Sequence, residues 1–306
     1  SQGHSAKLTH VCILLATHNG APYLEEQLQS YLDQDHQNWS LWVSDDASVD
    51  NTRDILCAFQ QAHPDRDIKV SEGPNKGLFA NFMNLIRHPD LPSGYVALSD
   101  QDDVWLPHRL SRALGSLRPA KSTAFYCSTS IITDAKLRPI SEHHPQPLLP
   151  ASFENALVQN IVAGNTIMLN PRALALLRGD PKVAHSLPYH DWWIYLRLMA
   201  AGADLICDPE PSLLYRQHEN NALGHRRYGR VRRLRGLLDG TYRSWVGSQA
   251  KALLNLPEET VLPVHRRAAS ALVNNPKRLE ALRESRAERH GLGGLLLPAL
   301  ASMALI

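Results

Sequence analysis

The stretch HVCILLATHNG, residues 10–20, combines an uninterrupted apolar run with a polar cluster that follows it directly. The apolar part, 10–16, has the length of a strand that is buried on both faces of a sheet. Apolar runs then alternate with helix-like stretches as far as about residue 120. We expect strands at 41–44, 67–71 and 95–98, and helices at 22–32, from about 50, at 78–87 and at 107–117. This alternation is typical of an α/β sheet.

The second half of the chain is less regular. Its apolar patterns predict strands at 123–133 and 165–169, and a strong helix at 189–201 that ends before Gly202. The proline-rich stretch 138–150 predicts a loop or flap. Beyond about residue 224 the sequence becomes basic and then helical, with Pro263 and Pro276 as breaks.

The composition is that of an ordinary folded protein. The 306 residues are 43% hydrophobic and 20% charged with a net charge of +2, which allows a large core and excludes a disordered chain. Arginines concentrate at 226–235 and could meet phosphates, nucleic acid or an anionic membrane, or form a solvated helix surface. No apolar run reaches the ~18–20 residues of a membrane span. The nearest, 291–306, is interrupted by Pro298 and could lie on a membrane or form a closing helix.

The cysteine pattern bears on the compartment. Cys12, Cys57, Cys127 and Cys207 lie far apart in the sequence and form no C-x-x-C pair. This spacing favours reduced thiols over a disulfide scaffold. The chain opens with a polar leader, 1–8, that lacks the features of a signal peptide. We therefore expect a cytoplasmic protein.

Polar clusters follow the expected strands at 17–20, 44–50, 75–77 and 99–103. Ligands of open α/β sheets bind at such strand ends. Helix capping accounts for Asp50, and can account for Ser48, without any function. It does not account for Asp100, Asp102 and Asp103, whose carboxylates repel one another unless a cation joins them. Hard cations such as Mg²⁺ take oxygen ligands, so we expect a metal site here, with a solvated acidic turn as the alternative.

Several common cofactor motifs are absent from the sequence. It contains neither G-x-G-x-x-G nor G-x-x-x-x-G-K-[ST], and no Cys/His spacing of a zinc site. The dinucleotide-binding and P-loop interpretations therefore lose their main support.

The polar clusters form a recognisable series of motifs. They read Thr17-His18-Asn19-Gly20, Asp45-Asp46-x-Ser48-x-Asp50-x-Thr52, Asn75-x-Gly77 and Asp100-x-Asp102-Asp103-x-Trp105-x-Pro107. This series resembles the family 2 glycosyltransferases with the GT-A fold. His190-Asp191-Trp192-Trp193 and Tyr215-Arg216-Gln217-His218-x-Asn220-Asn221 are similar to the bacterial rhamnosyltransferase branch of that family. The resemblance covers about residues 9–221, and its six motifs occur in the expected order.

The resemblance implies a GT-A-like mixed sheet with a single Rossmann-like nucleotide-binding half and a C-terminal helical extension. The catalytic domain would span 9–223, with a donor half at about 9–120 and an acceptor half at about 121–223. The basic helical extension would span 224–306.

The resemblance also implies roles in donor binding. Asp46 would accept a hydrogen bond from the N3–H of a pyrimidine, His18 would pack on the base, and Asp100 would contact the ribose side. The full set expected to bind the nucleotide sugar is Thr17, His18, Asn19, Asp46, Asn75, Gly77, Asn81, Asp100 and Gln101. Asp102 would hold a divalent cation, Mg²⁺ or Mn²⁺, that bridges the diphosphate. His218 would add a ligand, or is a partly buried structural histidine.

Asp191 is the expected general base. An acceptor hydroxyl is a poor nucleophile until its proton is being removed, and burial beside two indoles would raise the pKa of Asp191 towards neutral pH. The alternative is a helix N-cap. Trp192 and Trp193 are either core or sugar-stacking side chains. The set expected to contact acceptor or sugar is Gly164, Asn165, His190, Trp192 and Trp193.

The implied function is inverting transfer of a sugar from a nucleotide diphosphate to an acceptor hydroxyl. The resemblance favours dTDP-L-rhamnose as donor, with a UDP-hexose second. The acceptor would be a surface polysaccharide or lipid-linked glycan at the inner membrane face, which the C-terminal extension could contact. A nucleotidyltransferase is a rival, although residues 17–20 lack the basic side chains of its phosphate loop. A non-catalytic glycan- or nucleic-acid-binding protein is the other, but no specific nucleic acid is expected.

Overall fold

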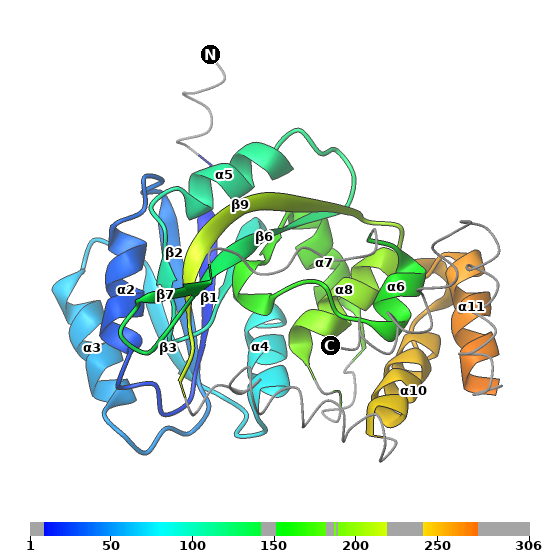
Figure 1. The fold of residues 1–306 in the computed structure, drawn as a ribbon, viewed down its shortest axis with the longest axis horizontal. Helices are drawn as coiled ribbons and strands as arrows, with labels where there is room; N and C mark the ends of the chain where they lie inside the picture. Colours follow the sequence, from blue (N-terminus) through cyan, green and yellow to red (C-terminus); the bar gives the residue numbers. More distant parts are fainter. Residues whose placement is uncertain (1–8, 142–150, 182–186, 188, 219–240, 275–306) are drawn as a thin grey trace.

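A computed structural model describes residues 9–141, 151–181, 187, 189–218 and 241–274. Within these residues one mixed sheet runs in the order β3-β2-β1-β4-β8-β6-β9-β5, with β7 paired to β6 (Figure 1). The first four strands are parallel: β1 (Val11–Thr17), β2 (Trp39–Asp45), β3 (Ile68–Glu72) and β4 (Tyr95–Ser99). The others are β5 (Val104–Trp105), β6 (Ala124–Thr133), β7 (Pro139–Ser141), β8 (Met168–Leu169) and β9 (Asp204–Arg216).

The central strand β1 shows why the sheet is buried on both faces. Its seven residues are all buried, and they alternate between two hydrophobic clusters. Val11, Ile13 and Leu15 belong to the cluster that includes side chains of α2 (Leu24–Leu32), α3 (Thr52–Ala62) and α5 (Arg109–Leu117). Cys12 and Leu14 belong to the cluster built with α4 (Leu78–Ile86), α6 (Phe153–Val158), α7 (Pro171–Gly179) and α8 (His190–Ala200). The continuous apolar run is therefore a central strand, as predicted.

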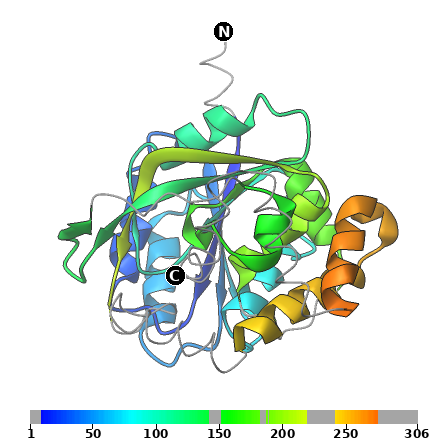
Figure 2. The same cartoon turned by 45° about the vertical axis from the view of Figure 1, so that its right-hand side comes forward.

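The long strands β6 and β9 arch across the sheet side by side (Figures 1 and 2). They pair in parallel from Ala124 and Asp204 onwards, with register shifts after Ser128. The sequence analysis missed β9, because Pro209 and Pro211 lack the N–H that a regular ladder requires. The register shifts accommodate them.

Other segments also differ from the sequence-based expectation. Residues 139–141, within the stretch predicted as a loop or flap, form β7, which pairs with β6. Residues 165–169, predicted as one strand, form a 3₁₀ turn, η1 (Gly164–Thr166), before the short β8. The carbonyls of Asn165 and Thr166 accept hydrogen bonds from the buried Arg109 and so do not join a ladder. Pro263, expected as a break, is the first residue of α11, a position that suits proline because no helical N–H is needed there.

The described part of the C-terminal extension forms α10 (Thr241–Leu254) and α11 (Pro263–Asn274). Both contribute buried side chains, including Val246 and Leu272, to the core cluster around α8. They lie at the end of the molecule opposite α2 and α3 (Figure 2). No helix among the described residues is long and apolar enough to cross a bilayer. The leader 1–8, the arginine-rich 226–235 and the apolar 291–306 lie outside the described residues.

Candidate active site

The site lies where the parallel strands end. The register pairs Thr17 of β1 with Asp45 of β2, and Leu15 of β1 with Ser99 of β4. The polar clusters that follow these strands therefore meet at one edge of the sheet, where open α/β sheets bind ligands.

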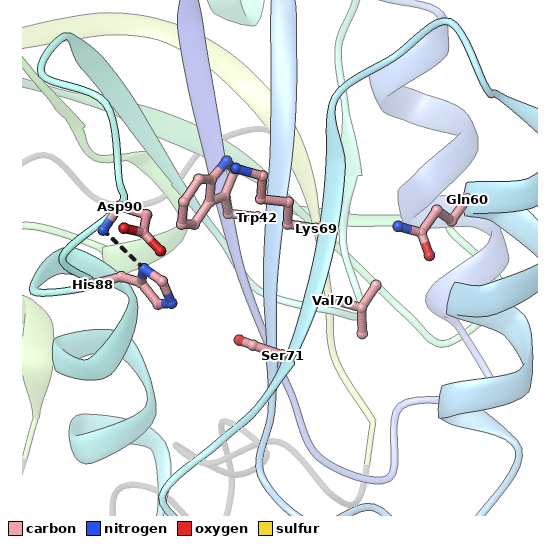
Figure 3. A pocket seen from close by; sticks show the side chains of 7 residues that line it. All are labelled: Trp42, Gln60, Lys69, Val70, Ser71, His88 and Asp90. Atoms are coloured by element: carbon pink, nitrogen blue, oxygen red, sulfur yellow. Dashed lines mark hydrogen bonds between the residues drawn. The ribbon is translucent and has the colours of Figure 1, made fainter.

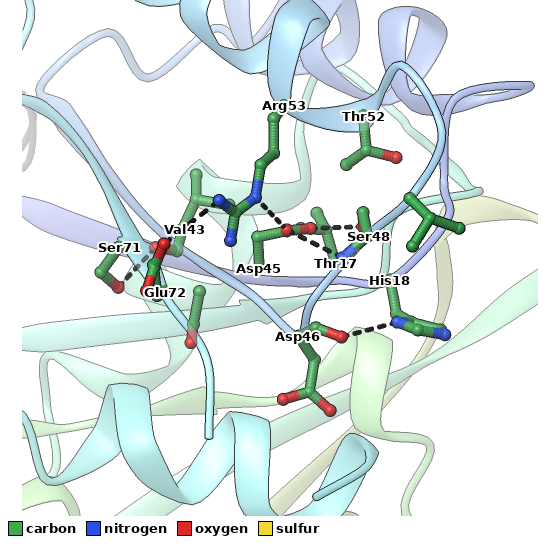
Figure 4. Close-up of polar contacts among 12 residues, drawn as sticks. Thr17, His18, Val43, Asp45, Asp46, Ser48, Thr52, Arg53, Ser71 and Glu72 are labelled. Atoms are coloured by element: carbon green, nitrogen blue, oxygen red, sulfur yellow. Dashed lines mark hydrogen bonds and ion pairs between the residues drawn. The ribbon is translucent and has the colours of Figure 1, made fainter. Parts of the chain in front are cut away.

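Asp45 fixes the turn after β2 (Figure 4). Its carboxylate accepts hydrogen bonds from the Thr17 hydroxyl at 2.8 Å, the Ser48 N–H at 3.1 Å and the Arg53 Nε–H at 2.8 Å. Burial works against ionisation, but the bonds from Ser48, Arg53 and Thr17 outweigh it and lower the pKa of Asp45. The carboxylate is fully engaged in holding the loop, so Asp45 anchors the turn.

The side chain of Asp46, next to Asp45 in the sequence, contacts the loop before α4. Its carboxylate accepts the backbone N–H groups of Asn75 at 2.5 Å and Gly77 at 2.8 Å. Both donors belong to residues with positive φ, 53° at Asn75 and 86° at Gly77. The backbone carbonyl of Asp46 contacts His18 Nδ1 at 2.7 Å. The three motifs around Thr17, Asp46 and Asn75 are therefore one connected structure.

Asn19 and Gln101 join the loops from the other side. The Asn19 N–H donates to the Ser48 hydroxyl at 2.8 Å, and its side-chain oxygen accepts the Val49 N–H at 2.9 Å. The Gln101 side-chain amide makes reciprocal 2.9 Å hydrogen bonds with the backbone N–H and C=O of His18. A Cβ at Gly20 would lie 2.2 Å from the Gln101 oxygen, so only glycine leaves room for this pairing.

Asn81 lies beneath the loops and is 1% exposed. Its amide donates to the Ser44 carbonyl at 2.8 Å and the Thr17 carbonyl at 3.4 Å, tying the ends of β2 and β1 together. Its side-chain oxygen has no partner among the described residues. In this structure Asn81 supports the loops from below.

The acidic loop gathers carboxylates at short range. Ligand atoms of Asp100, Asp102 and Asp103 all lie within 4.8 Å of one another. Asp103 is fully buried and accepts the Asn165 amide at 2.6 Å and the Arg216 N–H at 3.2 Å. The burial of Asp103 is inconsistent with a solvated acidic turn.

Asp100 supports a cation site most directly. One of its carboxylate oxygens is buried and has no hydrogen-bond partner among the described residues. Burial, and then the charges of Asp102 and Asp191, raise the pKa of Asp100 to about 8. A divalent cation would satisfy the unpartnered oxygen and offset the mutual repulsion, and carboxylate oxygens are the ligands that Mg²⁺ and Mn²⁺ accept.

The end of β9 closes the acidic loop. His218 Nε2 lies 2.8 Å from a carboxylate oxygen of Asp102, and the His218 ring packs on Tyr23 with centroids 4.6 Å apart. The buried Arg216 donates to the Asp102 carbonyl at 2.9 Å and to the Glu26 carboxylate. The structure thus brings His218 to Asp102, a contact that suits both expectations for His218, a metal ligand and a hydrogen-bonded structural histidine.

Asp191 lies at the start of α8, next to η1. Tyr189 occupies the N-cap position of the helix without a side-chain capping hydrogen bond, so Asp191, in the first turn, is not the N-cap residue considered from the sequence. Its carboxylate accepts the Trp192 N–H at 2.7 Å and the Gly164 N–H at 3.2 Å. Burial raises the pKa of Asp191 to about 6, against the opposing effect of these bonds. The adjacent residues Gly164 and Asn165 donate to Asp191 and to Asp103 respectively, so Asp191 lies near the acidic cluster.

The aromatic neighbours of Asp191 face the core. Trp192 and Trp193 are 4% and 0% exposed, and the Trp192 Nε1–H donates to the Ala156 carbonyl at 2.8 Å. His190 stacks on Phe82 of α4, with ring centroids 4.0 Å apart, and burial lowers its pKa to about 3. Of the two roles considered for the tryptophans, packing in the core describes them in this structure.

The sequence analysis missed Arg109 entirely. This fully buried guanidinium donates to the carbonyls of Leu98 at 2.9 Å, Asn165 at 2.6 Å and Thr166 at 3.2 Å. It therefore links the end of β4 to η1. An arginine on an amphipathic helix gives no sequence signal of such burial.

A cavity of about 350 Å³ lies away from these residues (Figure 3). It borders the edge strand β3 and is lined by Trp42, Gln60, Lys69, Val70, Ser71, His88 and Asp90. The Lys69 ammonium lies over the Trp42 ring, 4.3 Å from its centroid. No member of the acidic cluster lines this cavity.

Comparison with known proteins identifies the class. The model of glycosyl transferase family 2 matches residues 12–170. The dTDP-rhamnosyl transferase RfbG of Shigella flexneri is 30% identical over 220 residues, 69% of this chain and 73% of that protein. A β-1,3-glucosyltransferase of Escherichia coli, WfgD, named for transfer from UDP-Glc to α-D-GlcNAc-diphosphoundecaprenol, is 26% identical over 125 residues, 40% of this chain and 47% of that protein.

Solved structures share the fold. The mannosyltransferase PcManGT from Pyrobaculum calidifontis, in complex with GDP-Man and Mn²⁺, aligns with a TM-score of 0.56 and 20% identity over 97% of this chain and 80% of that chain. TarS 1–349 of Staphylococcus aureus with UDP aligns with a TM-score of 0.57 and 14% identity over the same shares, 97% and 80%. The fold and the sequence matches define a glycosyltransferase with the GT-A fold, as the motifs predicted. The chain belongs to glycosyltransferase family 2.

Proposed function

We propose that the protein transfers a sugar, with inversion, from a nucleotide diphosphate to an acceptor hydroxyl, and that the reaction depends on a divalent cation. The observation that carries this proposal is the juxtaposition of the Asp100–Asp102–Asp103 cluster, with its unpartnered buried oxygen, and the buried carboxylate of Asp191, which the adjacent residues Gly164 and Asn165 connect by hydrogen bonds. The acidic cluster is suited to bind a cation, and the Asp191 carboxylate is suited to accept a proton.

Different residues of the chain would bind the cation and accept the proton. Asp102, with His218 beside it, would hold Mg²⁺ or Mn²⁺, which supplies positive charge to the departing diphosphate. Asp191 takes the proton of the acceptor hydroxyl, and the N–H groups of Gly164 and Trp192 hold its carboxylate in place. A pKa of about 6 leaves Asp191 ionised at neutral pH yet basic enough to accept the proton.

The donor we favour is dTDP-L-rhamnose, because RfbG is a named dTDP-rhamnosyl transferase that aligns over 69% of the chain. A UDP-hexose is the second candidate, since WfgD is named for UDP-Glc. The diphosphoundecaprenol in that name also supports a lipid-linked glycan or growing surface polysaccharide as acceptor. We propose a cytoplasmic location, because the spacing of the four cysteines favours reduced thiols.

A thermal-shift panel of dTDP- and UDP-sugars, each with and without Mn²⁺ or Mg²⁺, tests the proposal. A ligand that binds only the native state raises the melting midpoint. The cognate donor should do so with metal and much less without it. Turnover should release a nucleoside diphosphate. Release of pyrophosphate would indicate a nucleotidyltransferase instead, and salt-dependent nucleic-acid binding without turnover would indicate a non-catalytic protein.

Pyrimidine selectivity is expected to depend on Asp46. Replacing it with Asn should weaken dTDP binding by about 1–3 kcal/mol, because the amide loses the charge that strengthens a bond from the base N3–H. Calorimetry with metal measures the effect. Asp46 also accepts two loop N–H groups, so ADP serves as the control ligand. Equal weakening of dTDP and ADP would assign the whole effect to the loop.

The C-terminal extension is proposed to contact the membrane surface, because its sequence joins the arginine-rich 226–235 to the apolar 291–306. Removing the residues after Arg289 should reduce co-sedimentation with anionic liposomes and leave donor binding unchanged. Identical partition of both proteins would contradict the proposed contact.

A further inference from the structure

Two cysteines that are distant in the sequence face each other across neighbouring strands. Cys127 of β6 and Cys207 of β9 are direct register partners in the parallel ladder. Their Sγ atoms lie 3.6 Å apart although 80 residues separate them. The sequence analysis treated all the cysteines as isolated, because nothing in their spacing reveals this pairing.

The two sulfur atoms have unequal environments. Cys127 is 5% exposed, whereas Cys207 is exposed. The Cys127 S–H donates to the Cys207 sulfur, and this contact lowers the pKa of Cys207 while it raises that of Cys127. The sulfur that solvent can reach is therefore the one that more readily becomes a thiolate, which is the reactive form.

We propose that Cys127 and Cys207 form an oxidation site, at which a peroxide converts the two thiols into an intrachain disulfide between β6 and β9. The Cys207 thiolate attacks one peroxide oxygen, breaks the O–O bond and becomes a sulfenic acid; the other oxygen leaves as hydroxide, which takes up the proton that the thiol had lost and becomes water. The Cys127 sulfur then displaces the sulfenic hydroxyl, and its proton leaves with that group as a second water. One peroxide is reduced and two thiols are oxidised, so the step balances.

The strand geometry permits this bond. Adjacent strands lie about 4.8 Å apart, within the range of about 4.4–6.8 Å between Cα atoms that a disulfide spans. The sulfurs must approach from 3.6 Å to about 2 Å, which requires side-chain rotation more than backbone movement. The pair lies one register position before the shifts that follow Ser128. The disulfide would therefore fasten the two strands just before their ladder becomes irregular.

Cys12 and Cys57 provide internal contrasts. Cys57 is exposed like Cys207, but no thiol contact is recorded for it among the described residues. Cys12 is 2% exposed, and burial raises its pKa to about 12. Under a mild oxidant, Cys57 can be modified singly but has no partner within reach, and Cys12 should be unreactive.

The test is maleimide labelling of the native protein before and after brief treatment with hydrogen peroxide, read by intact-mass and peptide mass spectrometry. The reduced protein should label at Cys57 and Cys207. The oxidised protein should have lost two hydrogen atoms, label at Cys57 alone and yield a peptide that joins Cys127 to Cys207. Dithiothreitol should restore labelling at Cys207.

Matched variants separate this outcome from general thiol oxidation. Cys207→Ser should abolish the loss of two hydrogens, whereas Cys57→Ser should retain it. The proposal would be overturned by peroxide treatment that leaves Cys207 fully labelled while Cys57 becomes oxidised. Disulfide-linked dimers in place of the intrachain bond would also overturn it. The inference does not depend on the proposed sugar transfer, because labelling and mass spectrometry measure the oxidation of the cysteines and not enzymatic activity.

Discussion

Asp191→Asn is expected to lower kcat on the order of 10²–10⁴-fold, the usual contribution of a general base. The amide is nearly isosteric with the carboxylate but cannot accept the proton of the acceptor hydroxyl. Donor affinity, measured by calorimetry with metal, should change little, because an interaction confined to the transition state leaves ground-state binding alone. Steady-state kinetics and calorimetry on this one variant therefore separate an effect on catalysis from an effect on donor binding.

The surroundings of Asp191 make this variant a fair comparison. The Asn oxygen can still accept an N–H from Gly164 or Trp192, so the start of α8 should stay folded. Circular dichroism and the melting midpoint serve as the controls. An Asp191→Asn protein with near-normal turnover would leave this site without an identified base.

The wild-type pH profile gives the same hypothesis a second test. Asp191 has a pKa of about 6, raised by burial, and it acts only when ionised. With saturating metal, which keeps the carboxylates of the acidic cluster ionised, the rate should therefore be level above this value and fall as the pH is lowered through it. In Asp191→Asn the residual rate should lose this acidic limb. An unchanged acidic limb in the variant would assign the titration to another group.

Asp102→Asn is expected to weaken metal-assisted binding of the nucleoside diphosphate on the order of 10²–10³-fold. Two unit charges at about 4 Å interact by about 4 kcal/mol at an effective dielectric constant of 20, and the substitution removes one of them. Calorimetry of dTDP and UDP with Mn²⁺ measures the loss. Without metal, the variant should bind the nucleotide at least as well as wild type, because it lacks a carboxylate charge that repels the diphosphate.

Asp134→Asn provides the control for net charge. Asp134 lies after β6, bonded to the exposed Arg138, and it is outside the acidic cluster. The Asp134→Asn substitution removes one negative charge, as Asp102→Asn does, but it removes it outside the acidic cluster. It should therefore leave metal-assisted binding unchanged. Equal affinity of Asp102→Asn and wild type in the presence of Mn²⁺ would refute the metal assignment.

The sequence predicted those parts of the fold that local pattern controls. β1 contains a long apolar run, β2 and β4 contain shorter ones at 41–43 and 95–98, and α8 ends at Ala200, close to the glycine that predicted its end. β9 was missed because its prolines obscure the strand signal. Of residues 165–169, predicted as one strand, Met168 and Leu169 do form a strand. Asn165 and Thr166 do not, because a buried arginine far away in the sequence donates to their carbonyls.

The candidate site was predictable as a list of residues but not as a set of contacts. The motifs located the acidic cluster and Asp191, which the structure brings near each other. The motifs could not reveal that the side chains of Asn19 and Asn81 form hydrogen bonds with neighbouring loops and strands. They also could not reveal Arg109, whose role depends on three carbonyls from two distant segments.

The contact between Asp102 and His218 has a consequence for biosynthesis. The two residues are 116 positions apart, so a ribosome that adds roughly 5–20 residues per second takes on the order of 6–23 s to make the second after the first. During that interval the nascent chain contains every carboxylate of the acidic loop, but β9 has not yet been completed. Such long-range strand pairing is intrinsically slow. Metal affinity should therefore arise late in folding, after β9 has paired with β6.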